Sequence, residues 1–312
     1  MERLSERKII LVTRSTRIDE LISRFNTESQ ARFYIEHLGD DFEDYQKEHE
    51  TYYSSVKECI ILLSKFGRLH KLDRGFLPNY TFGSEDIVVV LGQDGLVANT
   101  IKYLNGHPVV GVNPDPRRWD GVLLPFKVED LKLIMNEVIQ NRREFREITM
   151  AQVSLNTGTK MYAVNDFFIG PKTHTSARYI IQTNEGTEEQ SSSGIIVSTG
   201  LGSTGWFKSL LTGATGISTE LTGQKVKSKL YSQFTWESDF LCFTVREPFP
   251  SSNSQANILH GKIDRSKPLR LVSRMSDHGV IFSDGIEKDY VEFNSGTEAT
   301  VGVAEKKGKI IQ

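Results

Sequence analysis

The sequence predicts a two-domain protein in which residues 1–145 form a doubly wound α/β domain and residues 146–312 a mainly β domain. Three observations lead to this prediction. Continuous apolar runs alternate with helical periodicity up to about residue 143, as in a parallel sheet covered by helices. After Phe145 the chain becomes a series of short strand-like runs separated by turn residues. The length of 312 residues is enough for two domains of ordinary size.

The first half supplies buried strands in alternation with helices. Unbroken apolar, β-branched runs are typical of parallel strands that are buried on both faces. Residues at helical spacing between these runs predict the helices, and the acidic segment 40–50 is expected to be a partly ordered helix. The expected strands are 8–14, 68–74, 87–91 and 108–113, and the expected helices begin near Thr16 or Arg17 and cover 56–66, 97–104 and 128–143.

The second half is expected to contain one helix, which follows Gly202, and otherwise strands. Asp284-Gly285 is a hairpin-turn signal. Residues 185–193 are interpreted as a polar loop, whereas 212–230 show too little periodicity for an assignment. The expected strands are 148–155, 159–169, 177–183, 194–198, 241–246, 268–273, 279–282 and 290–293.

Composition excludes several classes of protein. Lysine and arginine number 38 against 40 acidic residues, so the net charge favours neither a nucleic acid nor an anionic membrane as partner. The only cysteines, Cys59 and Cys242, are too few for a disulfide framework and indicate a reducing compartment. The start of the sequence lacks a signal-peptide pattern, and no apolar run is long enough for a membrane span. We therefore expect a cytoplasmic protein.

A strand, a glycine turn and a helix start lie in sequence between Asp86 and Leu104. The apolar run 87–91 ends in Gly92-Gln93-Asp94-Gly95, and helical spacing begins directly afterwards. Backbone N–H groups and the positive end of a helix then meet at the carboxyl edge of a sheet, which is the geometry of a phosphate site. Two interpretations of Asp94 remain open: it accepts a proton or helps to hold a metal, or it only caps the helix.

Two further stretches place polar side chains where a nucleoside would be bound. Asn165-Asp166 interrupts an apolar run, and a carboxylate accepts the two vicinal hydroxyls of a ribose well. The alternative is a turn satisfied by nearby backbone. The glycine- and hydroxyl-rich loop 198–206 offers donors and the aromatic face of Trp206, although many such loops are only connections. The segment 113–126 places a proline turn beyond a strand end, where a purely structural role is favoured.

Other catalytic signatures are missing from the sequence. It contains no phosphate-binding loop of the Gly-x-x-x-x-Gly-Lys-Ser/Thr type, no Gly-x-Gly-x-x-Gly after the first strand and no Gly-x-Ser-x-Gly. The histidines lack zinc-site spacing, so no metal ligand is assigned, and His174 is interpreted as a solvated loop residue.

Taken in order, these stretches resemble the NAD kinase family, and most of all its mitochondrial-type branch. The family's Gly-Gly-Asp-Gly loop is similar to 92–95, its Asn-Glu/Asp pair to 165–166, and its Thr-x-Gly-Ser/Thr loop to 199–206. The resemblance extends from Lys8 to about Gly302. Segments similar to the mitochondrial-type branch are Arg14-Ser15-Thr16-Arg17, Asn113-Pro114-Asp115-Pro116-Arg117-Arg118, Ser192-Ser193-Gly194 and Arg246-Glu247-Pro248.

The resemblance implies an NAD kinase/diacylglycerol kinase-like fold and the transfer of a phosphoryl group from ATP, with Mg²⁺ or another divalent cation, to NAD. It also implies a homodimer or homotetramer. By the same resemblance, Asp94 would be the base for the 2′-hydroxyl of the adenosine ribose. Gly92 and Gly95 would admit phosphates to the backbone. The residues implied to bind the nucleoside are Asn165, Asp166, Thr199, Thr204, Gly205, Trp206 and Ser209.

Two positions depart from the family pattern and keep alternatives open. Gln93 replaces a glycine, where a side chain can crowd a phosphate, and Leu96 replaces a threonine or another small residue. The alternatives to an NAD kinase are a weakly active or non-catalytic NAD(P)-binding protein and a related kinase that acts on a lipid or sugar hydroxyl.

Overall fold

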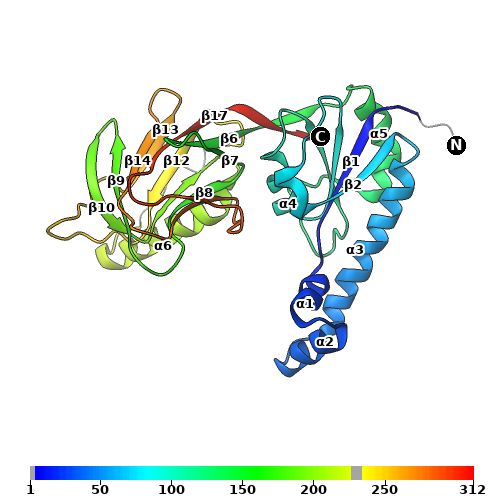
Figure 1. Cartoon of the computed structure of the whole chain (residues 1–312), viewed down its shortest axis with the longest axis horizontal. Coiled ribbons are helices and arrows are strands. Elements are labelled where there is room, and N and C mark those ends of the chain that lie inside the picture. The colour runs from blue at the N-terminus through cyan, green and yellow to red at the C-terminus, as the bar shows by residue number, and fades with distance from the viewer. Residues whose placement is uncertain (1–3, 226–233) are drawn as a thin grey trace. The chain divides into compact units, whose positions relative to one another are not determined.

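The computed structural model describes residues 4–225 and 234–312, which form two compact units (Figure 1). Unit 1 comprises Met1–Arg146 together with Lys309–Gln312, and unit 2 comprises Glu147–Gly308. The four C-terminal residues, which the sequence analysis assigned to the second domain, thus belong to unit 1. They are the end of a long strand, β17 (Glu298–Ile311), whose Lys309 and Ile310 pair with unit 1. The mixed α/β architecture with a β-rich second half is the predicted fold class, which is confirmed.

Unit 1 is built on a parallel sheet. Its strand order is β2-β1-β3-β4, followed by the end of β17, and β5 also pairs with β4. Every residue of β3 is buried, as the unbroken apolar run predicted. The strands of this sheet are β1 (Lys8–Thr13), β2 (Arg68–Asp73), β3 (Ile87–Leu91), β4 (Pro108–Asn113) and β5 (Phe126–Lys127).

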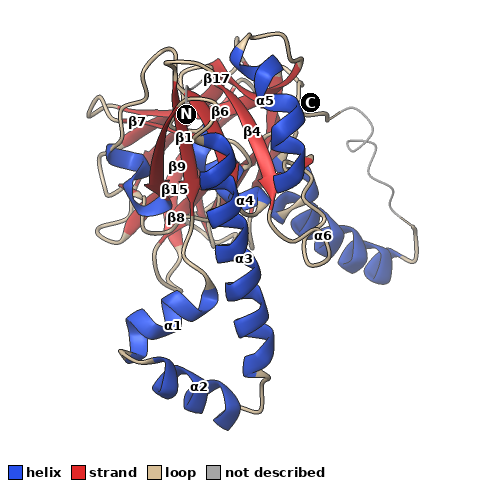
Figure 2. Cartoon of the chain, turned by 90° about the vertical axis from the view of Figure 1, so that its right-hand side faces the viewer, coloured by secondary structure: helices blue, strands red, loops and turns tan. Residues whose placement is uncertain are grey.

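Helices cover this sheet (Figure 2). Apolar residues of α3 and α5 share one core cluster with alternate residues of β1, β3 and β4, so both helices pack on the same face. The helices are α1 (Arg17–Phe25), α2 (Glu28–His37), α3 (Phe42–Leu63), α4 (Asp94–Ile101) and α5 (Leu131–Ile139), with short 3-10 helices η1 (Arg74–Asn79) and η2 (Val128–Asp130).

The acidic segment 40–50, for which the sequence predicted a partly ordered helix, is helical from Phe42 onward and forms the start of the long helix α3. Asp41 caps this helix, since its Oδ1 accepts the N–H of Glu43 at 2.8 Å. Phe42 is buried in a small core with residues of α1 and α2. Glu48 is only 4% exposed and binds both Arg14, at 2.8 Å, and Arg17. These contacts come from residues distant in sequence, which local composition does not reveal.

Replacing Glu48 by glutamine is expected to lower the free energy of unfolding by about 3–5 kcal/mol, because Arg14 loses its partner in a buried ion pair, whereas Arg17 keeps Asp44 at 2.8 Å. Urea denaturation measures this change. Glu50→Gln is the matched control, since Glu50 is exposed on the same helix and should shift stability by less than about 0.5 kcal/mol. Equal, small shifts in the two variants would show that the ion pair contributes nothing to stability.

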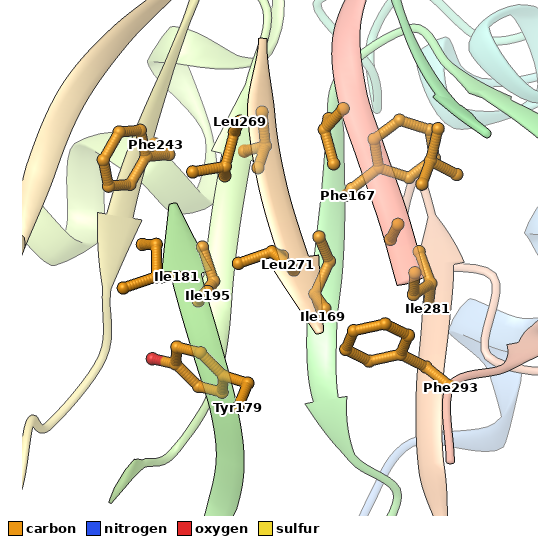
Figure 3. Packing of buried hydrophobic residues seen from close by; sticks show 14 of the residues in the cluster. Phe167, Ile169, Tyr179, Ile181, Ile195, Phe243, Leu269, Leu271, Ile281 and Phe293 are labelled. Atoms are coloured by element: carbon orange, nitrogen blue, oxygen red, sulfur yellow. The ribbon is translucent and has the colours of Figure 1, made fainter. Parts of the chain in front are cut away.

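Unit 2 consists mainly of two sheets whose inner faces share one apolar core (Figure 3). One sheet has the order β10-β9-β14-β17, with β6 pairing both β17 and β7; the other has the order β13-β12-β11-β8-β15-β16. Tyr179, Leu271, Ile195 and Phe167 are among the core residues. The strands are β6 (Phe145–Leu155), β7 (Lys160–Ala163), β8 (Asp166–Pro171), β9 (Ala177–Thr183), β10 (Gly186–Ser192), β11 (Ile195–Ser198), β12 (Phe240–Val245), β13 (His260–Asp264), β14 (Leu269–Ser273), β15 (Gly279–Ser283) and β16 (Val291–Glu292).

The helix expected after Gly202 is present as α6 (Trp206–Thr222), preceded by the 3-10 helix η3 (Gly202–Thr204). It accounts for part of the segment 212–230, whose remainder lies partly outside the described residues. The strand predicted over 159–169 is divided into β7 and β8 at Val164-Asn165. Strand β13 and the long strand β17 were not predicted. Among the described residues, no helix is both long and apolar enough to cross a bilayer.

The polar segment 185–193 is not a loop but contains strand β10, which pairs antiparallel with β9. Its buried polar side chains find tertiary partners. One oxygen of Glu188 accepts the backbone N–H groups of Asn257 and Ile258, each at 3.1 Å, and the side-chain amide of Gln190 at 2.8 Å. Buried polar groups with such partners are compatible with a strand, so the loop interpretation was wrong.

Candidate functional site

The turn between β3 and α4 presents a helix start that no side chain caps. Helix α4 begins at Asp94, and the side chain of the N-cap residue, Gln93, forms no capping hydrogen bond. Gly95 is exposed, and a Cβ atom at this position would meet nothing within 4 Å. The first N–H groups of a helix carry a partial positive charge and need acceptors. The turn is therefore suited to an anion.

Asp94 is not the capping residue that one interpretation of the sequence proposed. Its Oδ1 accepts the N–H of Leu123 at 2.7 Å, and its Oδ2 accepts that of Val122 at 3.3 Å. The carboxylate is thereby oriented toward the segment that follows β4. Because an ionised carboxylate has about four lone-pair sites, each oxygen can still accept another hydrogen bond.

The end of β3 is fixed by Tyr52 of α3, which also contacts Arg14 just after β1. The hydroxyl of Tyr52 donates to the carbonyl of Leu91 at 3.1 Å and accepts the N–H of Arg14 at 2.8 Å. The Arg14 guanidinium lies 5.0 Å from the centre of the Tyr52 ring and binds Glu48. Burial raises the pKa of the Tyr52 hydroxyl, which therefore stays protonated and keeps its donor. A fixed strand end gives the turn a fixed position.

The missing side chain of Gly92 makes room for the packing of Leu96. A Cβ atom at residue 92 would lie 2.8 Å from Cδ2 of Leu96 and 3.8 Å from Cδ of Arg14. Leu96 is 3% exposed, so its side chain fills the space that the glycine leaves. This contact explains why the chain combines a glycine at 92 with a leucine where the related pattern has a small residue.

Gly92→Ala is expected to lower the free energy of unfolding by about 1–3 kcal/mol, because the new methyl group overlaps Leu96. In the double variant Gly92→Ala/Leu96→Ala the new methyl group has room. The Gly92→Ala substitution should therefore cost less stability in the Leu96→Ala background than in the wild type. A double-mutant cycle from urea denaturation measures the difference. Gly95→Ala is the control at an open position of the same turn and should be neutral or slightly stabilising. Additive effects of the two substitutions would contradict the proposed contact.

In unit 2, the interruption between β7 and β8 is organised around a carboxylate that the sequence analysis did not place in a site. Asp284 accepts the N–H groups of Val164 at 3.0 Å, Asn165 at 2.6 Å and Asp166 at 3.4 Å. Its φ of 55° is a left-handed conformation, which aspartate tolerates better than most residues. The sequence signal was Asp284-Gly285, interpreted only as a hairpin turn.

A cavity of about 370 Å³ opens at this position. Among its lining residues are five of the predicted site residues: Asn165, Asp166, Thr204, Gly205 and Trp206, together with Asp284.

Two other predicted residues do not line the cavity. Thr199 is fully buried beneath it and donates its hydroxyl to the carbonyl of Val164 at 2.6 Å. Ser209 lies in the first turn of α6, where its N–H donates to the carbonyl of Gly205 at 3.3 Å. Thr199 therefore holds the loop in shape.

Asp166 differs chemically from an ordinary surface carboxylate. Burial, and next the negative charge of Asp284, raise the pKa of Asp166 to about 7. At neutral pH the group is therefore divided between an acid that donates and a carboxylate that accepts. With the amide of Asn165 beside it, the cavity offers both kinds of partner to vicinal hydroxyls and to the edge of a base.

Trp206 also borders a second cavity, of about 540 Å³. The Trp206 ring stacks on Phe168 with a centroid distance of 5.8 Å, and the Arg246 guanidinium lies 5.3 Å from the Trp206 centroid. His174, which the sequence analysis left in a solvated loop, and Ser193 line this second cavity. Trp206 thus borders both cavities and lies beside the cationic side chain of Arg246.

Neither known family models nor curated proteins match this sequence. Solved structures do resemble it. The crystal structure of an NAD kinase from Archaeoglobus fulgidus in complex with ATP covers 98% of this chain and 93% of its own, with a TM-score of 0.55 and 14% identity. The crystal structure of yeast NADH kinase complexed with NADH matches 98% of this chain over 84% of its own chain, with a TM-score of 0.56 and 17% identity. At these identities the likeness establishes the fold, which is that of NAD kinases.

The part of the chain that the structure describes contains no group of three or more His, Cys, Asp or Glu side chains placed to hold a metal ion. Mg²⁺ in nucleotide-dependent enzymes needs only one or two carboxylates, because the phosphates and water supply the other ligands. A cation of that kind therefore requires no such group among the described residues.

Proposed function

We propose that this protein is an NAD kinase that transfers the terminal phosphoryl group of ATP to the 2′-hydroxyl of the adenosine ribose of NAD, giving ADP and NADP. The observation that carries this proposal is the carboxylate of Asp94 at an uncapped helix start in a chain with the fold of NAD kinases. An anion-binding turn with an oriented acceptor beside it matches the needs of phosphoryl transfer to a hydroxyl.

Each candidate residue has a role in this proposal. The ribose oxygen attacks the terminal phosphorus of ATP, the bond from that phosphorus to ADP breaks, and the hydroxyl proton passes to a carboxylate oxygen of Asp94. The N–H groups at the start of α4, which include that of Gly95, would bind phosphate oxygens. Asn165 and Asp166 would bind the ribose and the edge of the base, and Trp206 would contact the adenosine. Such transfer depends mainly on positioning and on neutralising charge.

The finer assignments are also proposals. We place the chain closest to the mitochondrial-type branch because of Ser193 and the segments 14–17 and 113–118, and we expect a homodimer or homotetramer in the cytoplasm. A divalent cation, Mg²⁺ by preference, would accompany ATP and reduce the negative charge of its phosphates.

The test is direct. Purified protein with ATP, Mg²⁺ and NAD⁺ should form NADP⁺, which a dehydrogenase specific for NADP detects. The phosphate donor is defined by offering inorganic polyphosphate in place of ATP. The acceptor is defined by offering NADH, a sphingoid base or a free sugar, one at a time, in place of NAD⁺. Transfer of labelled phosphate to a lipid or sugar, without any NADP⁺, would contradict the proposal.

One specific observation favours a second candidate, a protein that binds NAD(P) but transfers phosphate slowly or not at all. Leu96 occupies the space beside Gly92, and both oxygens of Asp94 are engaged by backbone N–H groups. Calorimetry that shows NAD(H) or NADP(H) binding without phosphoryl transfer would support this candidate, the more so if Leu96→Thr or Gln93→Gly restored transfer.

A further inference from the structure

A hollow of about 280 Å³ lies against strands β9 and β10 in unit 2, where no residue of the proposed active site is found. Its lining is mostly polar and includes two arginines, several hydroxyls and one exposed phenylalanine. The lining residues that matter here are Arg178, Arg274, Ser191, Ser251 and Phe249.

The strand register places the two arginines directly opposite each other. Ser273 of β14 pairs with Tyr179 of β9, and the N–H of Arg274 donates to the carbonyl of Arg178 at 2.8 Å. Ser191 of β10 pairs with Arg178 from the other side. Side chains opposite one another in an antiparallel pair lie on the same face, with Cβ atoms about 4.5–5.5 Å apart. The order Ser191, Arg178, Arg274 therefore runs across one face of the sheet.

This arrangement places two like charges side by side on an exposed face of the sheet. Like charges directly opposite on neighbouring strands repel each other. Within residues 4–225 and 234–312, neither guanidinium forms an ion pair: Glu189 also lines the hollow, but it makes no salt bridge to either arginine. Some other arginines are paired closely, as Arg118 is with Asp44 at 2.6 Å. An anion between Arg178 and Arg274 would remove the repulsion.

We propose that this hollow binds the phosphate monoester of a small polyhydroxyl molecule, such as a sugar phosphate. Guanidinium groups bind phosphate oxygens through paired N–H donors. The hydroxyl of Ser191, which lies next to Arg178, serves as a further donor. Phe249 is 65% exposed and offers an apolar face to the carbon face of a sugar ring. The volume lies just below the roughly 300–1,000 Å³ of sites for drug-sized ligands, which suits a smaller metabolite.

The experiment uses the full-length protein and three probes in isothermal titration calorimetry: glucose 6-phosphate, glucose and inorganic phosphate. Glucose 6-phosphate should bind with a stoichiometry of one, more tightly than inorganic phosphate, and glucose should not bind. Arg178→Gln and Arg274→Gln should each weaken binding by about tenfold or more, since each removes a charged hydrogen-bond donor. Arg270→Gln is the matched control, because Arg270 is exposed on β14, which Arg274 directly follows, but does not line the hollow.

Several results would overturn the proposal. The first is that the wild type does not bind glucose 6-phosphate at millimolar concentration. The second is that Arg270→Gln loses as much affinity as the variants of Arg178 and Arg274. The third is that inorganic phosphate binds as tightly as the sugar phosphate. Because none of the substituted residues belongs to the proposed kinase site, failure here leaves the NADP⁺ assay unaffected, and the reverse also holds.

Thermal unfolding gives a second readout that keeps the test valid if a variant loses stability. Glucose 6-phosphate should raise the melting temperature of the wild type and of Arg270→Gln, but not that of Arg178→Gln/Arg274→Gln. Without any phosphate, Arg274→Gln should melt at or above the temperature of the wild type, because one of two repelling charges is gone. A clear decrease would show that the arginine pair stabilises the fold by itself, contrary to the proposal.

Discussion

Asp94→Asn is expected to lower the turnover number of NADP⁺ formation at least ~100-fold, because an amide cannot take the proton of the attacking hydroxyl. The substitution preserves the size of the side chain and one acceptor oxygen for the N–H of Leu123. The Michaelis constants for ATP and NAD⁺ should change far less than the turnover number, since the phosphate-binding N–H groups at the start of α4 remain. Steady-state kinetics with the NADP-specific coupled assay separates the two parameters.

The structural contribution of Asp94 has to be measured separately. Its Oδ2 accepts the N–H of the exposed Val122, and an amide NH₂ group at that place would cost about 0.5–1.5 kcal/mol of stability. Asp130→Asn is the matched control. Asp130 also accepts a backbone N–H, that of Lys127 at 2.7 Å, and it lies in unit 1 outside the turn. A similar modest loss of stability in both variants, with turnover lost only in Asp94→Asn, is the expected pattern.

Unchanged turnover in Asp94→Asn would remove the proposed base. Asp94 would then be understood through its two hydrogen bonds alone, as the residue that fixes the 122–123 segment against the helix start. Loss of turnover together with gross unfolding would also count against the proposal, since the hydrogen bonds that the variant disturbs are too few for that effect.

The sequence was most informative where burial and local chemistry agree. The apolar run of β3 is buried throughout, and the glycine turn after it leads directly into α4. Five predicted residues, from two stretches about 40 positions apart, do line one cavity. Their residue types indicated a nucleoside, and the two stretches adjoin β8 and β11, which are adjacent antiparallel strands.

What the sequence did not reveal depends on partners far along the chain. Strand β10 was interpreted as a loop because its polar residues are satisfied only by the segment near Ile258. Asp284 acts about 120 positions away from the N–H groups that it binds, so only its turn signal was visible. The missing side chain of Gly92 also makes room for Leu96, a contact that the sequence did not reveal. Composition and periodicity do not encode such contacts.

The second large effect concerns Asp166 and the pH dependence of stability. Its pKa is raised to about 7 from an ordinary value of 3.8, by burial and then by the charge of Asp284. Below pH 3.8 the carboxyl is protonated in both the folded and the unfolded chain. Between pH 3.8 and about 7 the unfolded chain releases the proton while the folded chain retains it. The contribution of Asp166 to the free energy of unfolding therefore falls across this window and is constant above it.

Asp166→Asn is expected to remove this fall. Because one pKa unit corresponds to about 1.4 kcal/mol, the difference between 3.8 and about 7 corresponds to a loss on the order of 4 kcal/mol in the wild type between pH 4 and pH 8. Urea denaturation of wild type and variant at a series of pH values gives the difference curve, in which other titrating groups cancel. Asp130→Asn again serves as control and should retain the fall in stability that the wild type shows.

Asp284→Asn distinguishes burial from charge as the cause. Without the negative charge of residue 284, the pKa of Asp166 should decrease, so the fall in stability should end at a lower pH and be smaller than in the wild type. The variant should also lose some stability, since Oδ2 of Asp284 accepts the N–H of Val164 at 3.2 Å and an amide NH₂ group at that place cannot accept it; the three bonds to Oδ1 remain. A wild type whose stability rises from pH 4 to pH 7 relative to Asp166→Asn would show instead that Asp166 is charged in the folded protein. Its cavity would then present a permanent carboxylate to any ribose that it binds.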